Sequence, residues 1–583
     1  MLAIQVNNEF IDLPAQISLE LERNNPFLSD DDIQGQFSLG LTIRYTEKNY
    51  RLLQYIGNFY KTNSKYTVDA AIYDAGIFRY AGKLVITQHQ SNMNNIEQTV
   101  WTGFFTIGSS SFLQSIQDVL LQDVDFGGER TFNYTTSDPD DGSGGFWQHI
   151  HAAVVPDAFP YCFYPINNEG WAPDYISLKW MNPFLADTQE FDSIFNAVTL
   201  CPALYLSFVL NKIFENFGWK LSGEILNDTG FKKITIPSFQ AINWCTFTRM
   251  AQQIVSVNPR PVITFDLADH VPPDVTIGSF LVSLKNRMGW YFEFDSGTKT
   301  AYLHGYQKII DASVKDWTKY VQSNYTSDYT DPAKIYSLVN NIDSSDEFPV
   351  LKEIDESAIV RVNSVGDLPS PTAANEDLIG YVFLDNSYYQ CQLTPDSDPP
   401  TFEWVFYAHN IGDYQQQPDF DTTIESDIST MPTLLMLYGT GNSAKVPVCS
   451  QPGNFRSNVS PWAVRFLFYH GMYPSTNGQL YPFASCDNTA ISGTDPTGAW
   501  VLPYRHEFGV VNDGTYDYWW KDWLRLLSIQ DSRTFTLALP VTELKKFSFS
   551  DIIFINNVFF VAQSVKEMLP YKDLIEMKMK RIY

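Results

Sequence analysis

A pattern of apolar residues occurs twice in the chain, 71 residues apart (Leu206 to Ile277). Both copies have the i, i+4, i+7, i+11 spacing of one helix face: Leu206, Leu210, Ile213 and Phe217, then Ile277, Leu281, Leu284 and Met288. Each stripe leads directly into Gly-Trp and a short strand-like run, at 220–223 and 291–294. We expect the glycine to end the helix in a left-handed conformation and the tryptophan to cover the exit onto a sheet. The repeat predicts a scaffold built by duplication of a helix–Gly-Trp–strand unit.

Alternating apolar and polar residues predict that both ends of the chain consist of strands. Near the N-terminus the segments are 2–6, 17–23, 36–44, 67–73, 83–88 and 98–106. Near the C-terminus they are 534–539, 552–555, 558–565 and 574–582, with Asn556-Asn557 typical of a tight hairpin turn. Helices are expected at 111–121 and, rich in aromatic residues, at 518–527. We therefore expect a β-rich α+β fold.

A chain of 583 residues is too long for one core and should divide into roughly three to five domains. The predicted parts are an N-terminal β-barrel-like domain (1–110), a connecting α+β region (111–199), the duplicated region (200–350), a small inserted β-module (358–410), a β-rich distal region (411–530) and C-terminal strands that complete a second barrel (531–583). Polar flanks favour a peripheral place for 358–410, with Tyr388, Tyr389 and Trp404 as its small core.

Composition limits the possible functions. Aromatic residues make up 15% of the chain, and 32 Pro and 32 Gly favour strands and turns. The net charge of −27 argues against a surface that grips nucleic acid, since phosphate binding needs a positive footprint. The negative charge is compatible with a channel wall past which DNA slides. It is equally compatible with an acidic exterior that only keeps the protein soluble.

Six widely spaced cysteines, listed here, are expected to be buried small apolar residues rather than a disulfide framework: Cys162, Cys201, Cys245, Cys391, Cys449 and Cys486. The N-terminal residues lack the pattern of a signal peptide, and no run of about 18 apolar residues predicts a membrane span.

Several segments resemble, in the same order, tail-hub proteins of long-tailed bacteriophages and prophages, particularly those of Bacteroidota. At the N-terminus these are Ile17-Ser18-Leu19-Glu20-Leu21-Glu22, Asn25-Pro26-Phe27, Gln36-Phe37-Ser38-Leu39 and Tyr50-Arg51-Leu52-Leu53. Further along they are Phe265-Asp266-Leu267-Ala268-Asp269-His270-Val271-Pro272, Arg465-Phe466-Leu467-Phe468-Tyr469-His470-Gly471-Met472, Asn477-Gly478-Gln479-Leu480-Tyr481-Pro482 and the stretch from Trp519 through Val565. Residues 358–410 depart from this pattern and resemble small β-modules inserted in phage tail proteins.

The resemblance implies a structural, non-enzymatic protein of the virion tail, made in the host cytoplasm. In such hubs two barrel-like domains per subunit form a homotrimer whose six barrels mimic a hexameric ring. The expected partners are a tail tube protein and tip or fibre proteins, with the host surface contacted indirectly. Genomic DNA would pass through without specific binding. The alternative is a polysaccharide-binding or polysaccharide-degrading protein of a tail tip or surface.

Two motifs could hold a metal ion, but each has a simpler interpretation. His149-x-His151 would place both imidazoles on one face of a strand, although ordinary surface histidines explain a single copy. In the loop 137–145, Asp138, Asp140, Asp141 and Gly142 miss the calcium-loop register, so a turn is expected. We therefore predict no metal and no cofactor.

No catalytic group stands out either. Arg505-His506-Glu507 lacks an identifiable nucleophile, and no spacing singles out a carboxylate pair for glycoside hydrolysis. Five aromatic residues, Tyr516, Tyr518, Trp519, Trp520 and Trp523, could stack on sugars, but a helix packed under a barrel is the favoured explanation. We predict no catalytic residues.

Overall fold

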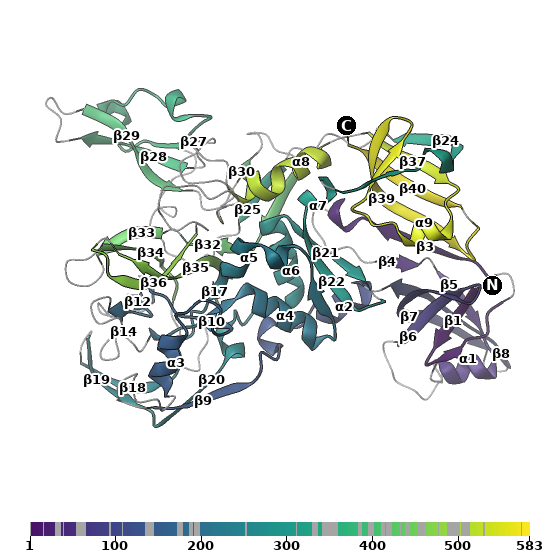
Figure 1. Cartoon of the computed structure of the whole chain (residues 1–583), viewed down its shortest axis with the longest axis horizontal. Helices are drawn as coiled ribbons and strands as arrows, with labels where there is room; N and C mark the ends of the chain where they lie inside the picture. Colours follow the sequence, from purple (N-terminus) through teal and green to yellow (C-terminus); the bar gives the residue numbers. More distant parts are fainter. Residues whose placement is uncertain are drawn as a thin grey trace.

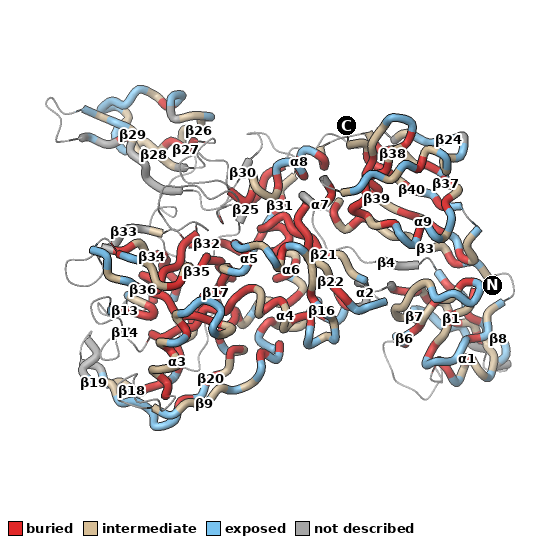
Figure 2. Tube along the Cα trace, viewed as in Figure 1, coloured by how far each residue is buried: buried red, intermediate tan, exposed pale blue. Residues whose placement is uncertain are grey.

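The computed structural model is rich in strands, and its helices are short (Figure 1). It describes residues 2–14, 17–28, 36–38, 40–53, 66–92, 95–107, 109–134, 145–168, 170–171, 179–185, 190–191, 199–250, 253–295, 297–310, 312–328, 336–340, 359–382, 387–394, 401–409, 414–415, 422–431, 433–437, 443–452, 461–475, 477–486, 502, 514–528, 531–572 and 574–582. Three clusters of buried apolar residues define an N-terminal β-unit, a C-terminal β-unit and a larger central body (Figure 2). The β-rich α+β class expected from the sequence is confirmed.

The N-terminal β-unit consists of strands that alternate buried and exposed residues. They are β1 (Leu2–Val6), β2 (Glu9–Phe10), β3 (Leu19–Asn24), β4 (Gln36–Ser38), β5 (Leu41–Arg44), β6 (Tyr66–Asp74), β7 (Ile77–Asn92) and β8 (Asn95–Ile107). A helix absent from our sequence expectations, α1 (Glu47–Leu52), begins where the Thr46 hydroxyl accepts a hydrogen bond from the amide of Asn49. The strands expected from alternation are therefore confirmed, with 36–44 divided into β4 and β5, whereas the helix α1 and the short strand β2 were missed.

The C-terminal β-unit combines the end of the chain with two strands from its middle. Its elements are β23 (Val314–Asp316), β24 (Val321–Asp328), β37 (Ser532–Leu537), β38 (Ile552–Ile555), β39 (Val558–Leu569), β40 (Ile575–Arg581) and α9 (Val541–Lys545). The predicted turn between β38 and β39 is confirmed, because Asn556 and Asn557 have φ angles of 47° and 65°.

The two β-units share one fourteen-stranded sheet, because β3 pairs antiparallel with β39 (Figure 1). The main path runs β2-β1-β6-β7-β8-β4-β3-β39-β40-β37-β24. We expected the C-terminal strands to complete a second barrel with the region 200–350. They pair with β23 and β24 of that region and also with β3, while the strands of the duplicated units form a sheet of their own.

A buried ion pair lies where the two β-units meet. Glu567 occupies an inward position of β39, between the buried residues Val565 and Leu569, and its carboxylate is 2.8 Å from the Arg79 guanidinium on β7. The two side chains are 0% and 5% exposed, respectively. The Tyr80 hydroxyl also donates to Glu567, and burial raises the pKa of Tyr80 to about 12, so this donor keeps its proton. The charge of Glu567 is thus neutralised by the partner unit.

The Asn25-Pro26-Phe27 motif, which follows β3, also contacts the C-terminal β-unit at this boundary. The buried Asn25 side chain donates to the carbonyl of Ala562 on β39 at 2.6 Å and accepts from the amide of Phe27 at 2.9 Å. Phe27 then enters the core of the C-terminal β-unit, where its ring meets that of Tyr291 edge-on. A short N-terminal segment therefore fills part of the C-terminal core.

The two predicted helices of the duplicated region are confirmed. They are α4 (Leu206–Asn216) and α6 (Ile277–Met288), whose apolar stripes share the core of the central body. Gly218 and Gly289 have φ angles of 69° and 66°, the left-handed stop expected for each glycine. The strands that follow, β16 (Lys220–Ser222) and β21 (Trp290–Asp295), lie on either side of β22 (Thr300–Gly305). The two units therefore contribute flanking strands to one small sheet.

The remaining elements of the central body surround these helices (Figure 1). Its other helices are α2 (Ser109–Ile116), α3 (Phe146–Ala152), α5 (Thr229–Lys233), α7 (Gln307–Ile310) and α8 (Lys521–Leu527), of which α7 and α8 pack their buried side chains into the core of the C-terminal β-unit. Its other strands are β9 (Glu129–Asn133), β10 (Tyr161–Cys162), β11 (Ile166–Asn168), β12 (Trp180–Met181), β13 (Phe184–Leu185), β14 (Glu190–Phe191), β15 (Ala203–Tyr205), β17 (Ile234–Pro237), β18 (Cys245–Met250), β19 (Gln253–Pro259), β20 (Val262–Asp266), β25 (Tyr336–Asn340), β30 (Tyr414–Gln415), β31 (Thr422–Ser426), β32 (Ser429–Thr430), β33 (Thr433–Leu437), β34 (Ser443–Cys449), β35 (Arg465–Pro474) and β36 (Leu480–Ser485).

All six cysteines are buried and free of disulfides, as expected. Across the part of the chain that the structure describes, no helix has the length and apolar character needed to cross a membrane.

Residues 360–409 contribute a separate four-stranded sheet that projects from one end of the molecule (Figure 1). Its strands are β26 (Val360–Val362), β27 (Ile379–Val382), β28 (Ser387–Thr394) and β29 (Thr401–His409), in that order. The fully buried side chains include Tyr381, Val382 and Cys391, whereas Tyr388, Tyr389 and Trp404 are half-buried. Tyr381 lies opposite Tyr388 and Cys391 opposite Trp404, so these buried residues share a face of the sheet with two of the expected aromatic residues.

Replacing Glu567 by Gln should destabilise the protein by about 3–5 kcal/mol, because Arg79 would remain buried without its counter-ion. The neighbouring variant Lys566→Ala is the control, since it removes only the half-exposed pair with Glu22 at 3.7 Å. That change should cost at most about 1 kcal/mol. Urea unfolding of the three proteins measures both effects, and equal losses in the two variants would contradict a special role for the buried pair.

Candidate functional site

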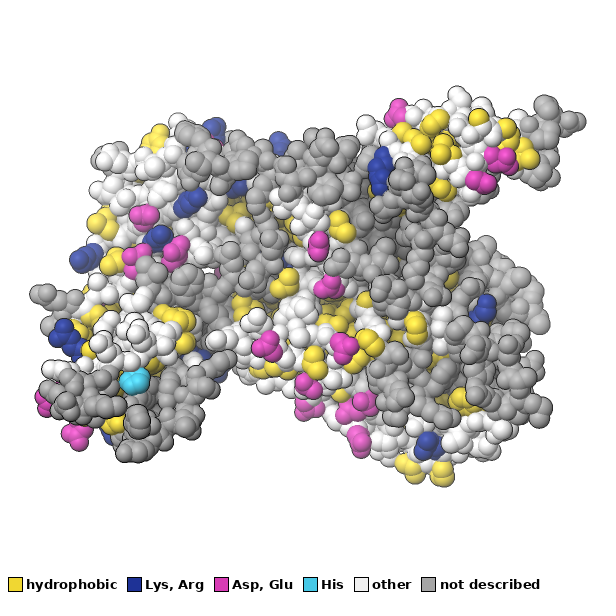
Figure 3. All heavy atoms as spheres, turned by 180° about the vertical axis from the view of Figure 1, so that it is seen from behind, with side chains coloured by type: hydrophobic (Ala, Val, Ile, Leu, Met, Phe, Trp, Pro, Cys, Tyr) yellow, Lys and Arg dark blue, Asp and Glu magenta, His cyan; other side chains and the backbone are white. Residues whose placement is uncertain are grey.

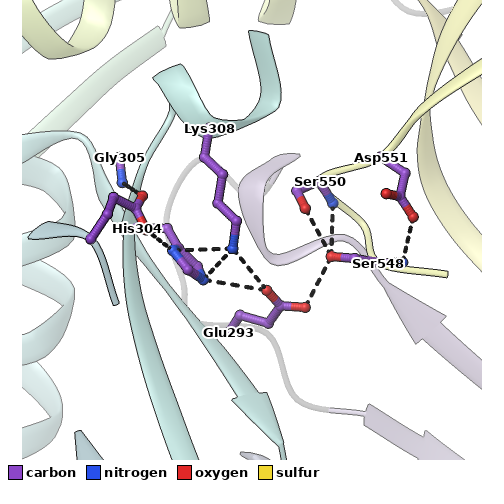
Figure 4. Close-up of polar contacts among 8 residues, drawn as sticks. Glu293, His304, Gly305, Lys308, Ser548, Ser550 and Asp551 are labelled. Atoms are coloured by element: carbon purple, nitrogen blue, oxygen red, sulfur yellow. Dashed lines mark hydrogen bonds and ion pairs between the residues drawn. The ribbon is translucent and has the colours of Figure 1, made fainter. Parts of the chain in front are cut away.

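Charged and titratable side chains gather where the central body meets the C-terminal β-unit (Figure 4). His304 is the centre of this His304 network and is 6% exposed. Its Nδ1 atom is hydrogen-bonded to Glu224, and its Nε2 atom lies 3.5 Å from the carboxylate of Glu293 and 2.5 Å from the Lys308 ammonium. Glu293 in turn accepts a hydrogen bond from Ser548 of the C-terminal β-unit at 3.1 Å. The network therefore links two parts of the molecule.

Local structure explains why these side chains converge. On the antiparallel pair β21–β22, Tyr291 lies opposite His304 and Glu293 opposite Tyr302, so the four side chains share one face. The helix α7 follows directly after β22 and returns Lys308 over His304. Glu224 comes from the segment after β16, the parallel neighbour of β22. Its second carboxylate oxygen accepts a hydrogen bond from the amide of Gly305 at 3.1 Å.

The network has two alternative protonation states. At 2.5 Å from the Lys308 ammonium, Nε2 acts as an acceptor, so the imidazole in this arrangement is neutral and donates from Nδ1 to Glu224. A protonated ring would instead turn its Nε2–H to Glu293. Burial alone would lower the pKa of His304, but the hydrogen bonds with Glu224 and Glu293 outweigh burial and raise the pKa above 6.5.

The same contacts act on the two carboxylates. Burial would raise the pKa of Glu224 and that of Glu293, yet their interactions with His304, and in the case of Glu293 with Lys308, hold both below 4.5. Both groups therefore remain charged near neutral pH. Ser548 bonds to Glu293 rather than to the imidazole, so the geometry is not that of a serine nucleophile activated by histidine. The arrangement is suited to joining two parts of the fold, with charge compensated on both sides.

The structure corrects the interpretation of His149-x-His151. These residues lie on α3 rather than on a strand, so positions two apart point to different sides of the helix. The His149 imidazole is 2.5 Å from the Tyr161 hydroxyl and packs against Phe132 and Phe159. Burial, followed by the nearby Arg130, lowers the pKa of His149 to about 4. This histidine is a packed neutral residue.

The two other polar motifs fall mainly outside the described residues. Of the loop 137–145 only Gly145 is described, and Arg505-His506-Glu507 is not described. Within the described ranges, no group of three His, Cys, Asp or Glu side chains is placed to hold a metal ion.

The aromatic cluster divides between two environments. Tyr516–Trp520 form a one-turn π-helix, η11, that continues into α8. Trp520 and Trp523 are fully buried, as a helix packed under a β-unit requires, while Tyr516, Tyr518 and Trp519 are half-buried. Trp519 therefore remains a candidate for contact with a ligand.

Neither charged cluster, the His304 network or the Arg79–Glu567 pair, follows from the sequence motifs. Glu293 lies in the strand-like run 291–294, which the sequence predicts without its partners, and Glu224 is 69 residues away from Glu293. One usable signal was present, because Glu567 occupies an inward position in an otherwise apolar alternation. A charge at such a position indicates a buried partner.

Two solved structures are similar to this chain at low sequence identity and low TM-score. No family model and no curated protein sequence matches the chain. Among solved structures, the 43 kDa tail protein of prophage MuSo2 from Shewanella oneidensis has 6% identity and a TM-score of 0.32, with 100% of this chain and 96% of that chain covered. The tail protein from Neisseria meningitidis MC58 has 6% identity and a TM-score of 0.31, with 99% and 95% covered.

The His304 network predicts a stability contribution that depends on pH. Because the folded pKa of His304 is raised, its contribution is present below about pH 6.5 and is lost as the pH rises through the folded value. The lowered pKa values of Glu224 and Glu293 require a pH above about 4.5. The wild type should therefore exceed His304→Gln in stability most clearly near pH 5.5, with a smaller difference at pH 8.5.

Urea unfolding at both pH values measures this difference. The exposed His89 provides the matched control, and His89→Gln should follow the wild type at both pH values. An advantage of the wild type over His304→Gln that grows from pH 5.5 to 8.5 would contradict the raised pKa.

Proposed function

We propose that this protein is a structural tail-hub protein of a bacteriophage virion. Three copies form a ring that connects the tail tube to distal tip or fibre proteins, and contact with the host surface is indirect through those proteins. The chain is made in the host cytoplasm and functions in the assembled tail. The observation that carries this proposal is the joining of two β-units, from opposite ends of the chain, into one continuous sheet through β3 and β39.

This arrangement suits a trimeric ring that binds a neighbouring ring of six subunits in the tail tube. With two β-units held side by side in each chain, three chains present six units around an axis, and closed rotational symmetry prevents open-ended polymerisation. The joint must be rigid for the six units to keep a constant spacing. The β3–β39 ladder, the buried Arg79–Glu567 pair and the inserted Phe27 all favour a rigid joint.

The residues that carry the family resemblance support the same proposal by their positions. Asn25-Pro26-Phe27 lies at the boundary of the two β-units, and the stretch from Trp519 through Val565 leads from η11 into β39. The segment 465–472 lies in β35, a strand buried in the central body. The matching segments thus contribute to packing, as expected for a protein whose role is architectural.

We further propose that the protein is not an enzyme. The members of the His304 network are hydrogen-bonded or ion-paired with one another, and its serine is bound to a carboxylate. In the ring, DNA passes through without being held. On the face shown in Figure 3, acidic side chains gather over the middle of the molecule, which suits a surface that repels phosphates.

Native mass spectrometry of the assembled protein tests the proposed stoichiometry. We expect a species of three times the chain mass of 66.6 kDa, or multiples of it when rings stack. A monomer or dimer as the stable form in the native assembly would refute the ring.

The passive role toward DNA has a separate test. The assembled protein should leave the anisotropy of a labelled 30-base-pair duplex unchanged at about 10 mM salt, where the screening length is about 30 Å and attraction is strongest. A lysine-rich peptide of known affinity serves as the positive control. Tight binding that weakens as salt is added would overturn the conduit role while leaving the trimer untouched.

A further inference from the structure

A pocket of about 560 Å³ opens beside the His304 network, between the end of β22 and η11. Its volume lies in the range typical of small-ligand sites. The walls include Trp519 and Ile225, and the rim carries polar side chains from η5 (Ile225–Asn227) and α7. Gly305 lies against the tryptophan, because a Cβ at this position would be 2.7 Å from the Trp519 ring. The glycine therefore allows the indole to lie close to the strand.

We propose that this pocket binds a neutral saccharide, with Trp519 as the ring on which one sugar face packs. A sugar ring combines an apolar C–H face with hydroxyl groups that each donate and accept hydrogen bonds. The pocket offers both kinds of surface: an indole and an isoleucine for the apolar face, and four polar side chains, Glu224, Asn227, Asp228 and Lys308, for the hydroxyls.

The indole is held in a fixed orientation. Its ring meets Trp290 edge-on at 5.7 Å and Tyr518 edge-on at 4.8 Å, so little conformational freedom is lost when a ligand packs against it. Its neighbours Trp520 and Trp523 are buried, whereas Trp519 is half-buried and lines the pocket. Trp519 and Trp520 are consecutive positions of η11, and consecutive helix positions point to different sides of the helix.

The polar groups are positioned before any ligand arrives. Glu224 is held by His304 and by the amide of Gly305, yet its side chain is 49% exposed and each carboxylate oxygen retains a further acceptor position. Asp228 is oriented by accepting a hydrogen bond from the amide of Phe231 at 2.8 Å. Lys308 is held by His304 and Glu293, and Asn227 is exposed at the rim. Two carboxylates, the Asn227 amide and the Lys308 ammonium thus line one cavity.

The charges of the lining disfavour an acidic ligand. Glu224 and Asp228 repel an acidic sugar, and the Lys308 ammonium offsets one of their two charges, so the attraction for a cation is weak. Neither charge obstructs hydroxyl groups, for which charged partners make stronger hydrogen bonds than neutral ones. The pocket is part of a single chain, so the proposal is independent of the assignment as a tail hub.

Isothermal titration calorimetry of the full-length protein tests the proposal with maltotriose and chitotriose as neutral probes. Trigalacturonate and trilysine are the acidic and cationic comparisons. We expect at least one neutral probe to bind with one site per chain, at least tenfold more tightly than either charged probe. Absence of binding for both neutral probes, or tighter binding of trilysine, would overturn the proposal, and the latter would indicate a peptide-binding pocket.

Three variants locate the binding site. Trp519→Leu should abolish binding of the neutral probe, and Asn227→Ala should weaken it about twofold to tenfold, the loss expected for one hydrogen bond. Asn227 is exposed, so this variant remains decisive if Trp519→Leu fails to fold. Gln114→Ala, an exposed amide on α2, is the matched control and should bind as the wild type does. Wild-type affinity in Asn227→Ala would place the sugar elsewhere and refute the assignment.

Discussion

The antiparallel pairing of β3 with β39 is the constraint on which the rest of the architecture depends. Six residue pairs, from Leu19 opposite Leu569 to Asn24 opposite Ser564, join strands that lie more than 500 positions apart in the chain. Without this ladder each β-unit would present an unpaired edge at this boundary, with unsatisfied backbone groups. With it, the two ends of the chain form one body, and the central part is connected to that body through β23 and β24. Residues 17–28 accordingly contribute to both β-units.

The buried charge of Glu567 determines the register of β39 at the boundary between the two β-units more specifically than apolar packing does. An apolar surface tolerates small shifts, but Glu567 is satisfied only where Arg79 and Tyr80 meet it. A slip of β39 by one residue would turn Glu567 away from both partners and leave their buried groups unsatisfied. The His304 network acts in the same way at the boundary between the central body and the C-terminal β-unit, where Ser548 closes the chain of contacts. Both joints use a buried or half-buried carboxylate from one part and donors from the other.

Local patterns predicted the local structure well. The stripes through Leu210 and Leu281 identified α4 and α6, and the glycines after them were correct as helix stops, because helix periodicity and left-handed backbone are determined by neighbours in the sequence. The same reasoning failed for His149 and His151. Two histidines at positions i and i+2 are too short a pattern to distinguish a strand from a helix, and they lie on α3. Local patterns contain no information about which distant segments pair. The partners of β39, Glu567 and His304 therefore could not be predicted, because they lie far away in the sequence. The pocket next to Trp519 could not be predicted for the same reason, since η5, β22 and η11 meet only in the folded chain.

The central claim is that each chain supplies two joined β-units to a threefold ring. Electron cryomicroscopy of the intact tail that contains this protein tests it directly. We predict a layer of six similar β-units around the tail axis, in which N-terminal and C-terminal β-units alternate and each chain supplies one of each. The three copies of the inserted module 358–410 should lie on the periphery of this layer. Six equivalent copies of the chain in that layer, or two β-units of one chain separated from each other, would contradict it.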